Sequence, residues 1–97
     1  MRKVFWNKLA KADYFKIVDY LIDIWGDSSA QNFIVEVDKI ESILESGKAD
    51  FEITNRKNIR RYVLSKHVTL FYKTYGKDSV ELLRFWNNYQ DKNRMKF

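Results

Sequence analysis

The 97-residue chain contains no cysteine, only three glycines and a single histidine, His67. Without cysteine it can form no disulfide, no thiolate zinc site and no cysteine nucleophile. One histidine is too few for metal motifs that need a histidine pair, and the carboxylates are not grouped in a metal-binding loop. We therefore expect neither a metal site nor a cofactor.

Long hydrophobic runs are also missing. The most apolar stretch, Ile17 to Trp25, is interrupted by Asp19 and Asp23 and is shorter than the roughly 18 to 20 residues that a membrane span needs. The first eight residues carry charges and lack the apolar core and small-residue cleavage site of a signal peptide. The sequence therefore predicts a cytoplasmic protein with no membrane segment.

Apolar residues are nevertheless abundant. Hydrophobic residues make up 45% of the chain and aromatic residues 16%, enough for one core at this length, so we expect a single domain over residues 1–97. The 18 lysines and arginines outnumber the 13 aspartates and glutamates, which gives a net charge of +5. This charge favours an anionic partner, such as nucleic acid or an acidic protein segment, without identifying it.

A short strand and a helix are predicted at the start of the chain. Val4 to Trp6 has β propensity, and apolar residues then recur every three or four positions up to Trp25. Asn7 is the expected N-cap of this helix and Gly26 its end. Its apolar positions are Leu9, Tyr14, Val18, Leu21, Ile22 and Trp25.

A second helix follows and forms a hairpin with the first. Ser28 and Gln31 have the spacing of a capping box at its start, and Ser46 and Gly47 form a natural stop. One face collects the apolar residues Ala30, Phe33, Ile34, Val37, Ile40 and Leu44.

Three strands are predicted in the second half, after a connection from Lys48 to Lys57 that has room for a small extended piece. The strands cover residues 59–64, 68–75 and 80–86, and a turn at residues 76–78 joins the last two. We expect an α+β fold in which a short N-terminal strand and a helical hairpin pack on a twisted antiparallel sheet, in the order β-α-α-β-β-β. Both faces of the middle strand carry apolar residues, so one face is a candidate partner surface, and the tail from Asn87 to Phe97 is expected to cover the sheet edge or to fray.

Characteristic segments occur in order along nearly the whole chain. They are Phe5 to Asn7, Asp19 to Ile22, Ser28 to Phe33, Asn58 to Leu64, Thr69 to Lys73, Val80 to Trp86, and Gln90 with Asp91. Together, their order and spacing resemble the RelE/ParE superfamily of bacterial toxins, which belong to type II toxin–antitoxin pairs. The resemblance implies a toxin, of the kind that stabilises plasmids or responds to stress, that a cognate antitoxin holds inactive.

Two mechanisms occur in this superfamily. RelE-like members cleave mRNA in the ribosomal A site with basic residues and a tyrosine or histidine, whereas ParE-like members poison DNA gyrase and are not known as nucleases. Thr69 stands where the ribonucleases tend to carry a catalytic arginine, and the amides of Asn87 and Asn88 replace basic residues or histidine after the last strand. Amides cannot supply full positive charge to a pentavalent phosphate.

Several residues remain candidates for a metal-independent RNA cleavage, which needs a base, an acid and cations on the phosphate. Lys57, Arg60, Arg61 and Tyr89 form the set that a ribonuclease would use, although strand alternation places Arg60 and Arg61 on opposite faces. His67 and Arg84 are further candidates. His67 also fits a turn, and Arg84 fits a buried ion pair with a helix carboxylate on the same side as Val80, Leu82 and Trp86. The residues expected to contact a target or antitoxin are Arg56, Arg60, Arg61, Arg84, Lys92 and Arg94.

Three functions follow from this pattern. The first is a ParE-like toxin that inhibits DNA gyrase by binding, without catalytic residues. The second is a RelE-like endoribonuclease that needs the ribosome and mRNA as partners. The third is a remnant that binds an antitoxin but poisons nothing. A cognate antitoxin is the expected partner in each case, and a homodimer is a further possibility.

Overall fold

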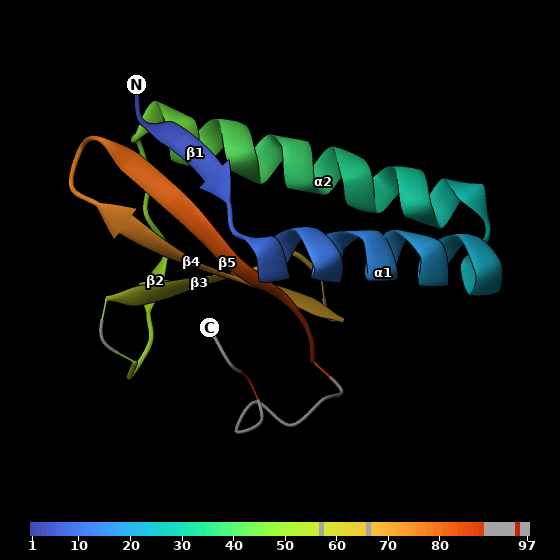
Figure 1. The fold of residues 1–97 in the computed structure, drawn as a ribbon. Helices are drawn as coiled ribbons and strands as arrows, with labels where there is room; N and C mark the ends of the chain where they lie inside the picture. Colours follow the sequence, from blue (N-terminus) through green and yellow to red (C-terminus); the bar gives the residue numbers. More distant parts are fainter. Residues whose placement is uncertain (57, 66, 89–94, 96–97) are drawn as a thin grey trace.

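The computed structural model describes residues 1–56, 58–65, 67–88 and 95. Two helices lie on one side of a five-stranded sheet (Figure 1). In chain order the elements are β1 (Lys3–Trp6), α1 (Lys8–Trp25), α2 (Asp27–Ser46), β2 (Glu52–Ile53), β3 (Ile59–Val63), β4 (Val68–Tyr75) and β5 (Ser79–Asn87). This order confirms the predicted α+β fold, and β2 is the small extended piece for which the connection had room.

The ends of α1 follow from local sequence. The side chain of Asn7 accepts a hydrogen bond from the Ala10 N–H at 2.8 Å and so caps the first turn, as predicted. Gly26 separates the two helices with φ of 90°, a backbone conformation that side chains disfavour.

The predicted capping box of α2 is wrong. The helix begins at Asp27, so Ser28 lies inside the first turn, and the N-cap Gly26 has no side chain to form a cap bond. Gly47 ends the helix in the left-handed conformation with φ of 71°, as its sequence position predicted.

The strand order in the sheet is β1-β5-β4-β3-β2. The strands from β2 to β5 are antiparallel to their neighbours, whereas β1 pairs in parallel with β5. The helical hairpin between β1 and the other strands allows this parallel pairing, because parallel strands need a long crossover. The sheet is therefore mixed, with an antiparallel body and one parallel edge strand.

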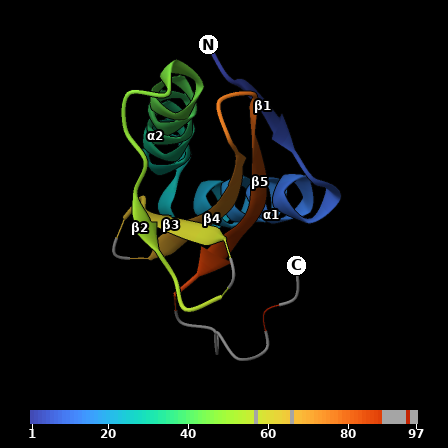
Figure 2. The ribbon, with the colours of Figure 1, turned by 90° about the vertical axis from the view of Figure 1, so that its left-hand side faces the viewer.

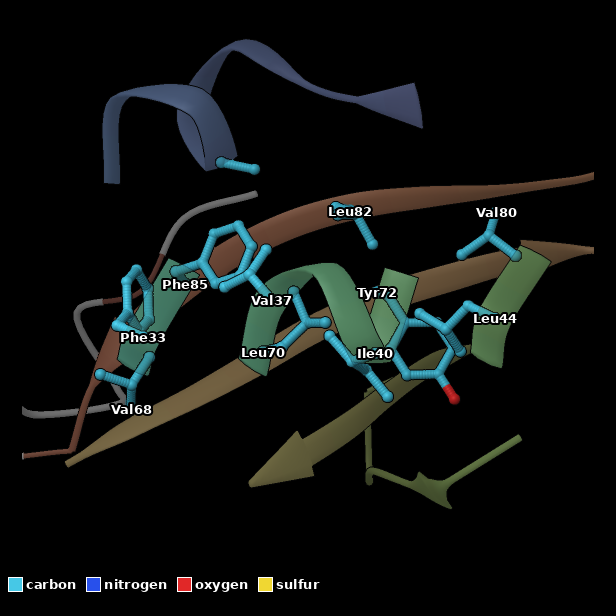
Figure 3. Close-up of a cluster of buried hydrophobic side chains, with 11 residues drawn as sticks. Phe33, Val37, Ile40, Leu44, Val68, Leu70, Tyr72, Val80, Leu82 and Phe85 are labelled. Carbon is cyan, nitrogen blue, oxygen red and sulfur yellow. The ribbon is translucent and has the colours of Figure 1, made fainter. Parts of the chain in front are cut away.

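The core lies between the helices and one face of the sheet. Side chains of α2 point towards β4 and β5, and the ring of Tyr72 lies among them (Figure 3). The Tyr72 hydroxyl accepts a hydrogen bond from the Phe51 N–H at 2.7 Å, and burial raises the pKa of this hydroxyl. The buried residues of this cluster are Ala10, Phe33, Val37, Ile40, Leu44, Val68, Leu70, Tyr72, Val80, Leu82 and Phe85.

The expected apolar face of α1 is only partly correct. Tyr14, Val18 and Leu21 pack against the core, but Leu9, Ile22 and Trp25 are 39%, 44% and 67% exposed. The far end of α1 extends beyond the sheet (Figure 1), which accounts for the exposure of Ile22 and Trp25 but not for that of Leu9 in the first turn. Phe5, Phe15, Tyr20 and Tyr75 are exposed as well, whereas the other aromatic residues that the structure describes are buried or half-buried.

Candidate functional site

The candidates Arg60 and Arg61 lie on opposite faces of the sheet. Arg60 pairs across the strands with Tyr72 on the helix side, and Arg61 pairs with Phe71 on the other side. Alternation along β3 produces this separation, as the sequence predicted. The two guanidinium groups therefore do not share a site.

Each of these arginines already has a partner. Arg60 Nη1 donates a hydrogen bond to the Phe51 carbonyl oxygen at 2.7 Å. Arg61 Nε and Nη2 donate to the two carboxylate oxygens of Glu52 at 3.0 and 2.8 Å. The hydrogen bonds with Arg61 lower the pKa of the Glu52 carboxyl, and those with Glu52 raise the pKa of Arg61. This pair is largely exposed, so it contributes little to stability and can exchange partners at low cost.

Arg84 has a structural role between the sheet and α1. Its Nε and Nη2 donate to the two carboxylate oxygens of Asp13 at 2.6 and 2.9 Å, and both side chains are mostly buried. Asp13 Oδ2 also accepts a bond from the Phe85 N–H at 3.1 Å. β1 pairs with β5 as far as Leu82. Beyond that point, Asp13 instead of a strand residue accepts the hydrogen bond from the β5 backbone. The prediction of an ion pair with a helix carboxylate is thus confirmed.

The predicted facing of the β5 residues is wrong. Tyr72 pairs with Leu82 whereas Phe71 pairs with Arg84, so β5 contains an extra residue at Leu83. This bulge shifts the alternation of the strand. Val80 and Leu82 consequently face the helices, whereas Trp86 faces the opposite side of the sheet together with Phe71.

That opposite side carries a second apolar cluster. Phe71, Leu83, Trp86 and Met95 are each at most 6% exposed, and Ile59 packs against them. Met95 shows that part of the tail covers this face of the sheet rather than its edge. Arg56 lies beside it, with Nη1 3.4 Å from the Met95 carbonyl oxygen. The apolar area that the sequence placed on this face is therefore partly covered by the chain itself.

Thr69 and His67 also have structural positions. Thr69 is buried, and its hydroxyl donates to the Asn88 side-chain oxygen at 2.7 Å. His67 lies in the turn between β3 and β4, where its N–H donates to Ser65 Oγ at 3.1 Å and its carbonyl oxygen accepts from the Asn88 N–H at 2.8 Å. The turn prediction for His67 is confirmed.

The other predicted site residues cannot be placed. Lys57 and Tyr89 of the ribonuclease set, and Lys92 and Arg94 of the binding set, lie outside the described residues. Within the described part of the chain, no group of three or more histidine, aspartate or glutamate side chains could hold a metal ion. The helices that the structure describes include none long and apolar enough to cross a membrane.

Exposed apolar residues are the surface feature that the sequence reading missed. Phe15, Tyr20, Ile24 and Trp25 on α1 are between 55% and 67% exposed. Ile53 and Val63, at the β2 side of the sheet, are 57% and 58% exposed. The signal in α1 was present, because apolar residues occur around more of its circumference than one buried face requires.

Comparison with known proteins identifies the family. A family model described as the ParE toxin of the type II toxin–antitoxin system parDE matches residues 4–91. No curated protein matches the sequence.

Solved structures show the same fold. The chain is similar to a structure of the chromosomal ParDE TA system from P. aeruginosa, with 18% identity, a TM-score of 0.73, and coverage of 90% of this chain and 96% of that one. It is also similar to a copper-bound mutant toxin from Helicobacter pylori, with 19% identity, a TM-score of 0.66, and coverage of 92% and 97%. A conserved hypothetical protein from the same organism shares 21% identity with a TM-score of 0.52, and coverage is 93% and 98%.

Proposed function

Because the chain belongs to the ParE toxin family of type II toxin–antitoxin systems, we propose that it inhibits DNA gyrase by binding and that a cognate antitoxin neutralises it. The observation that carries the choice of mechanism is the separation of Arg60 from Arg61. RNA cleavage needs several groups acting on one phosphate. The two arginines face opposite sides of the sheet, and each holds a local partner.

The position of Thr69 supports the same choice. In RNA-cleaving members of the superfamily an arginine is expected at this place, whereas Thr69 is buried and bonded to Asn88. Arg84, the basic residue of β5, forms a mostly buried ion pair with Asp13. Among the described residues, Arg60, Arg61 and Arg84 do not converge on one position, which favours inhibition by binding over cleavage of a phosphodiester.

Induction of the chain in bacteria, with pulse labelling of DNA and protein synthesis in the first minutes, separates the two mechanisms. We expect DNA damage while translation continues, and inhibition of gyrase-catalysed supercoiling by the purified chain. The variants Arg60→Ala and Arg61→Ala test the alternative, because each removes one cation of the candidate ribonuclease set. Early loss of protein synthesis with cleaved mRNA, abolished in either variant, would instead establish the ribonuclease.

For the antitoxin we propose a binding site at the β2 side of the sheet, the edge formed by β2 and the end of β3. β2 pairs with Arg60 and Arg61, while β3 continues to Val63, so the end of β3 lies at an edge that no described strand covers. Open edges pair readily with an extended segment of another chain. The exposed side chains of Ile53 and Val63 would give that segment apolar contacts. Figure 2 shows this edge on the same side of the molecule as α2.

Substitution of Ile53 and Val63 by lysine tests this place. Burial of two lysines against the antitoxin is unfavourable, so we expect the double variant to remain toxic and to bind antitoxin at least tenfold more weakly, a loss of about 1.4 kcal/mol or more. Ile24→Lys is the matched control, because Ile24 is 59% exposed on α1, which packs on β5. Titration of purified toxin with antitoxin by calorimetry gives the affinities. Equal affinities for the double variant and the unaltered chain would place the antitoxin elsewhere.

A further inference from the structure

On the outward side of α1, basic side chains lie towards the start of the helix and acidic side chains lie towards its end. Residues 8, 12, 16, 19 and 23 follow one another at spacings of three or four, so they lie on one side of the helix, and all of them are exposed. The basic members come first and the acidic members last. We call this set the outer face of α1; it comprises Lys8, Ala12, Lys16, Asp19 and Asp23.

This charge order is unfavourable within the helix itself. Helix N-termini favour acidic side chains and C-termini basic ones. α1 has no acidic residue in its first turn and no basic residue in its last turn. Among the described residues, Lys8, Lys16 and Asp19 take part in no ion pair that would compensate for this. The pattern therefore has no evident purpose within one chain.

Apolar side chains border the outer face on both sides. Phe15 and Ile22 lie along one border and are 62% and 44% exposed. Leu9 and Tyr20 lie along the other border and are 39% and 55% exposed. Side chains of this size gain free energy when a partner removes them from water. The outer face thus combines an apolar contact area with two charged halves of opposite sign.

We propose that the outer face of α1 binds the same face of a second copy of this chain, with the two helices antiparallel. A two-fold axis through the middle of α1 places Lys16 of each copy beside Asp19 of the other, and Lys8 towards Asp27 at the start of α2. The charge pattern points to a second copy as the partner. When two identical helices lie antiparallel, the basic half of each lies opposite the acidic half of the other. Such an isologous contact closes after two chains.

The small residue Ala12 lies within the outer face and allows the two helices to approach closely. One helix per copy buries less than the roughly 800 Å² per partner of a standard stable interface. We accordingly expect a weak dimer that forms at micromolar or higher concentrations. This contact is separate from the β2 side of the sheet, and it does not depend on gyrase being the target.

Sedimentation of the full chain over micromolar to near-millimolar concentrations tests the proposal. We expect a reversible monomer–dimer equilibrium. Asp19→Lys should weaken the dimer at least tenfold, because the new lysine lies beside Lys16 of the other copy. The swapped variant with Lys16→Glu and Asp19→Lys should restore the affinity to within about threefold, since the complementary pairs are present again. Asp78→Lys, at an exposed turn far along the chain, is the charge control and should leave the equilibrium unchanged.

A second pair of variants tests the apolar borders. Phe15→Ser should weaken the dimer at least tenfold, whereas Val35→Ser, at a residue 47% exposed on α2, should not change it. All of these side chains are exposed, so circular dichroism should show the same fold in each variant. A chain that stays monomeric at the highest concentration would overturn the proposal. Loss of the dimer in Val35→Ser but not in Phe15→Ser, or no rescue in the swapped variant, would overturn it as well.

Discussion

Arg2 joins three segments that are far apart in the sequence. It is 7% exposed, and its Nε donates to the Leu44 carbonyl oxygen at 2.9 Å, at the end of α2. Its Nη2 donates to Asp50 at 2.9 Å, in the connection before β2. A cation at a helix C-terminus also stabilises the helix dipole. This single residue therefore fixes β1, the end of α2 and the following loop relative to one another.

Replacement of Arg2 by methionine keeps the apolar part of the side chain and removes the hydrogen bonds. We expect the free energy of unfolding to fall by about 1–3 kcal/mol, because Asp50 and a helix-end carbonyl lose a charged donor. The value lies below that of a fully buried pair, since Asp50 is 32% exposed. Urea unfolding measures the change, and Lys3→Met on the exposed neighbour is the control. Equal losses in the two variants would contradict the role given to Arg2.

At the scale of elements, the junction between α1 and α2 depends on Gly26. Its φ of 90° and ψ of 176° lie in a region that is essentially restricted to glycine. No atom lies within 4 Å of an added Cβ, so a substitution there meets backbone strain but no clash. The effect of an alanine at this position is therefore a measure of the backbone conformation alone.

We expect Gly26→Ala to lower the free energy of unfolding by about 1–3 kcal/mol. Ser28→Ala should change it by less than about 0.5 kcal/mol, because Ser28 is exposed inside the first turn of α2 and does not cap it. The loss of a true N-cap would instead cost about 1 kcal/mol. Thermal unfolding of both variants separates the observed junction from the capping box that the sequence suggested.

The elements that local sequence predicted well are those fixed by local chemistry. Asn7, Gly47 and the apolar periods of α2 act within a few residues, so the helices and the sequence of elements along the chain could be predicted. The bulge at Leu83 could not, because it depends on how β5 matches β4 across the sheet. Strict alternation of side chains along β5 therefore predicted the wrong face of the sheet for Trp86.

Candidate site residues were predicted less well for a related reason. The sequence placed Arg60 and Arg61 on opposite faces, but it could not show that Phe51 and Glu52 would hold them. Those contacts depend on the path of the connection between α2 and β3. The exposed side of α1 was missed because periodicity counts apolar residues without showing how far the sheet extends beneath a helix (Figure 1).

For the whole molecule, the sheet has an apolar cluster on each face. The helices cover one face, and Met95 covers part of the other together with Arg56. The chain segment that contributes Met95 also brings Lys92, Arg94 and Lys96, three of the cations behind the net charge of +5. The sequence therefore predicts a second role for this short segment, attraction to an anionic target, beside the packing of Met95.

Two variants separate these contributions. Removal of residues 92–97 takes away both Met95 and the three cations, whereas Met95→Ala removes only the apolar contact. Each should lower the free energy of unfolding by about 2–5 kcal/mol, the range for a buried methionine cut back to alanine. If the cations contact the target, inhibition of gyrase should fall much further in the truncated chain than in Met95→Ala, and the inhibition that remains should be less sensitive to salt. Equal inhibition by the two variants, compared at a temperature where both are folded, would limit the role of this segment to stability.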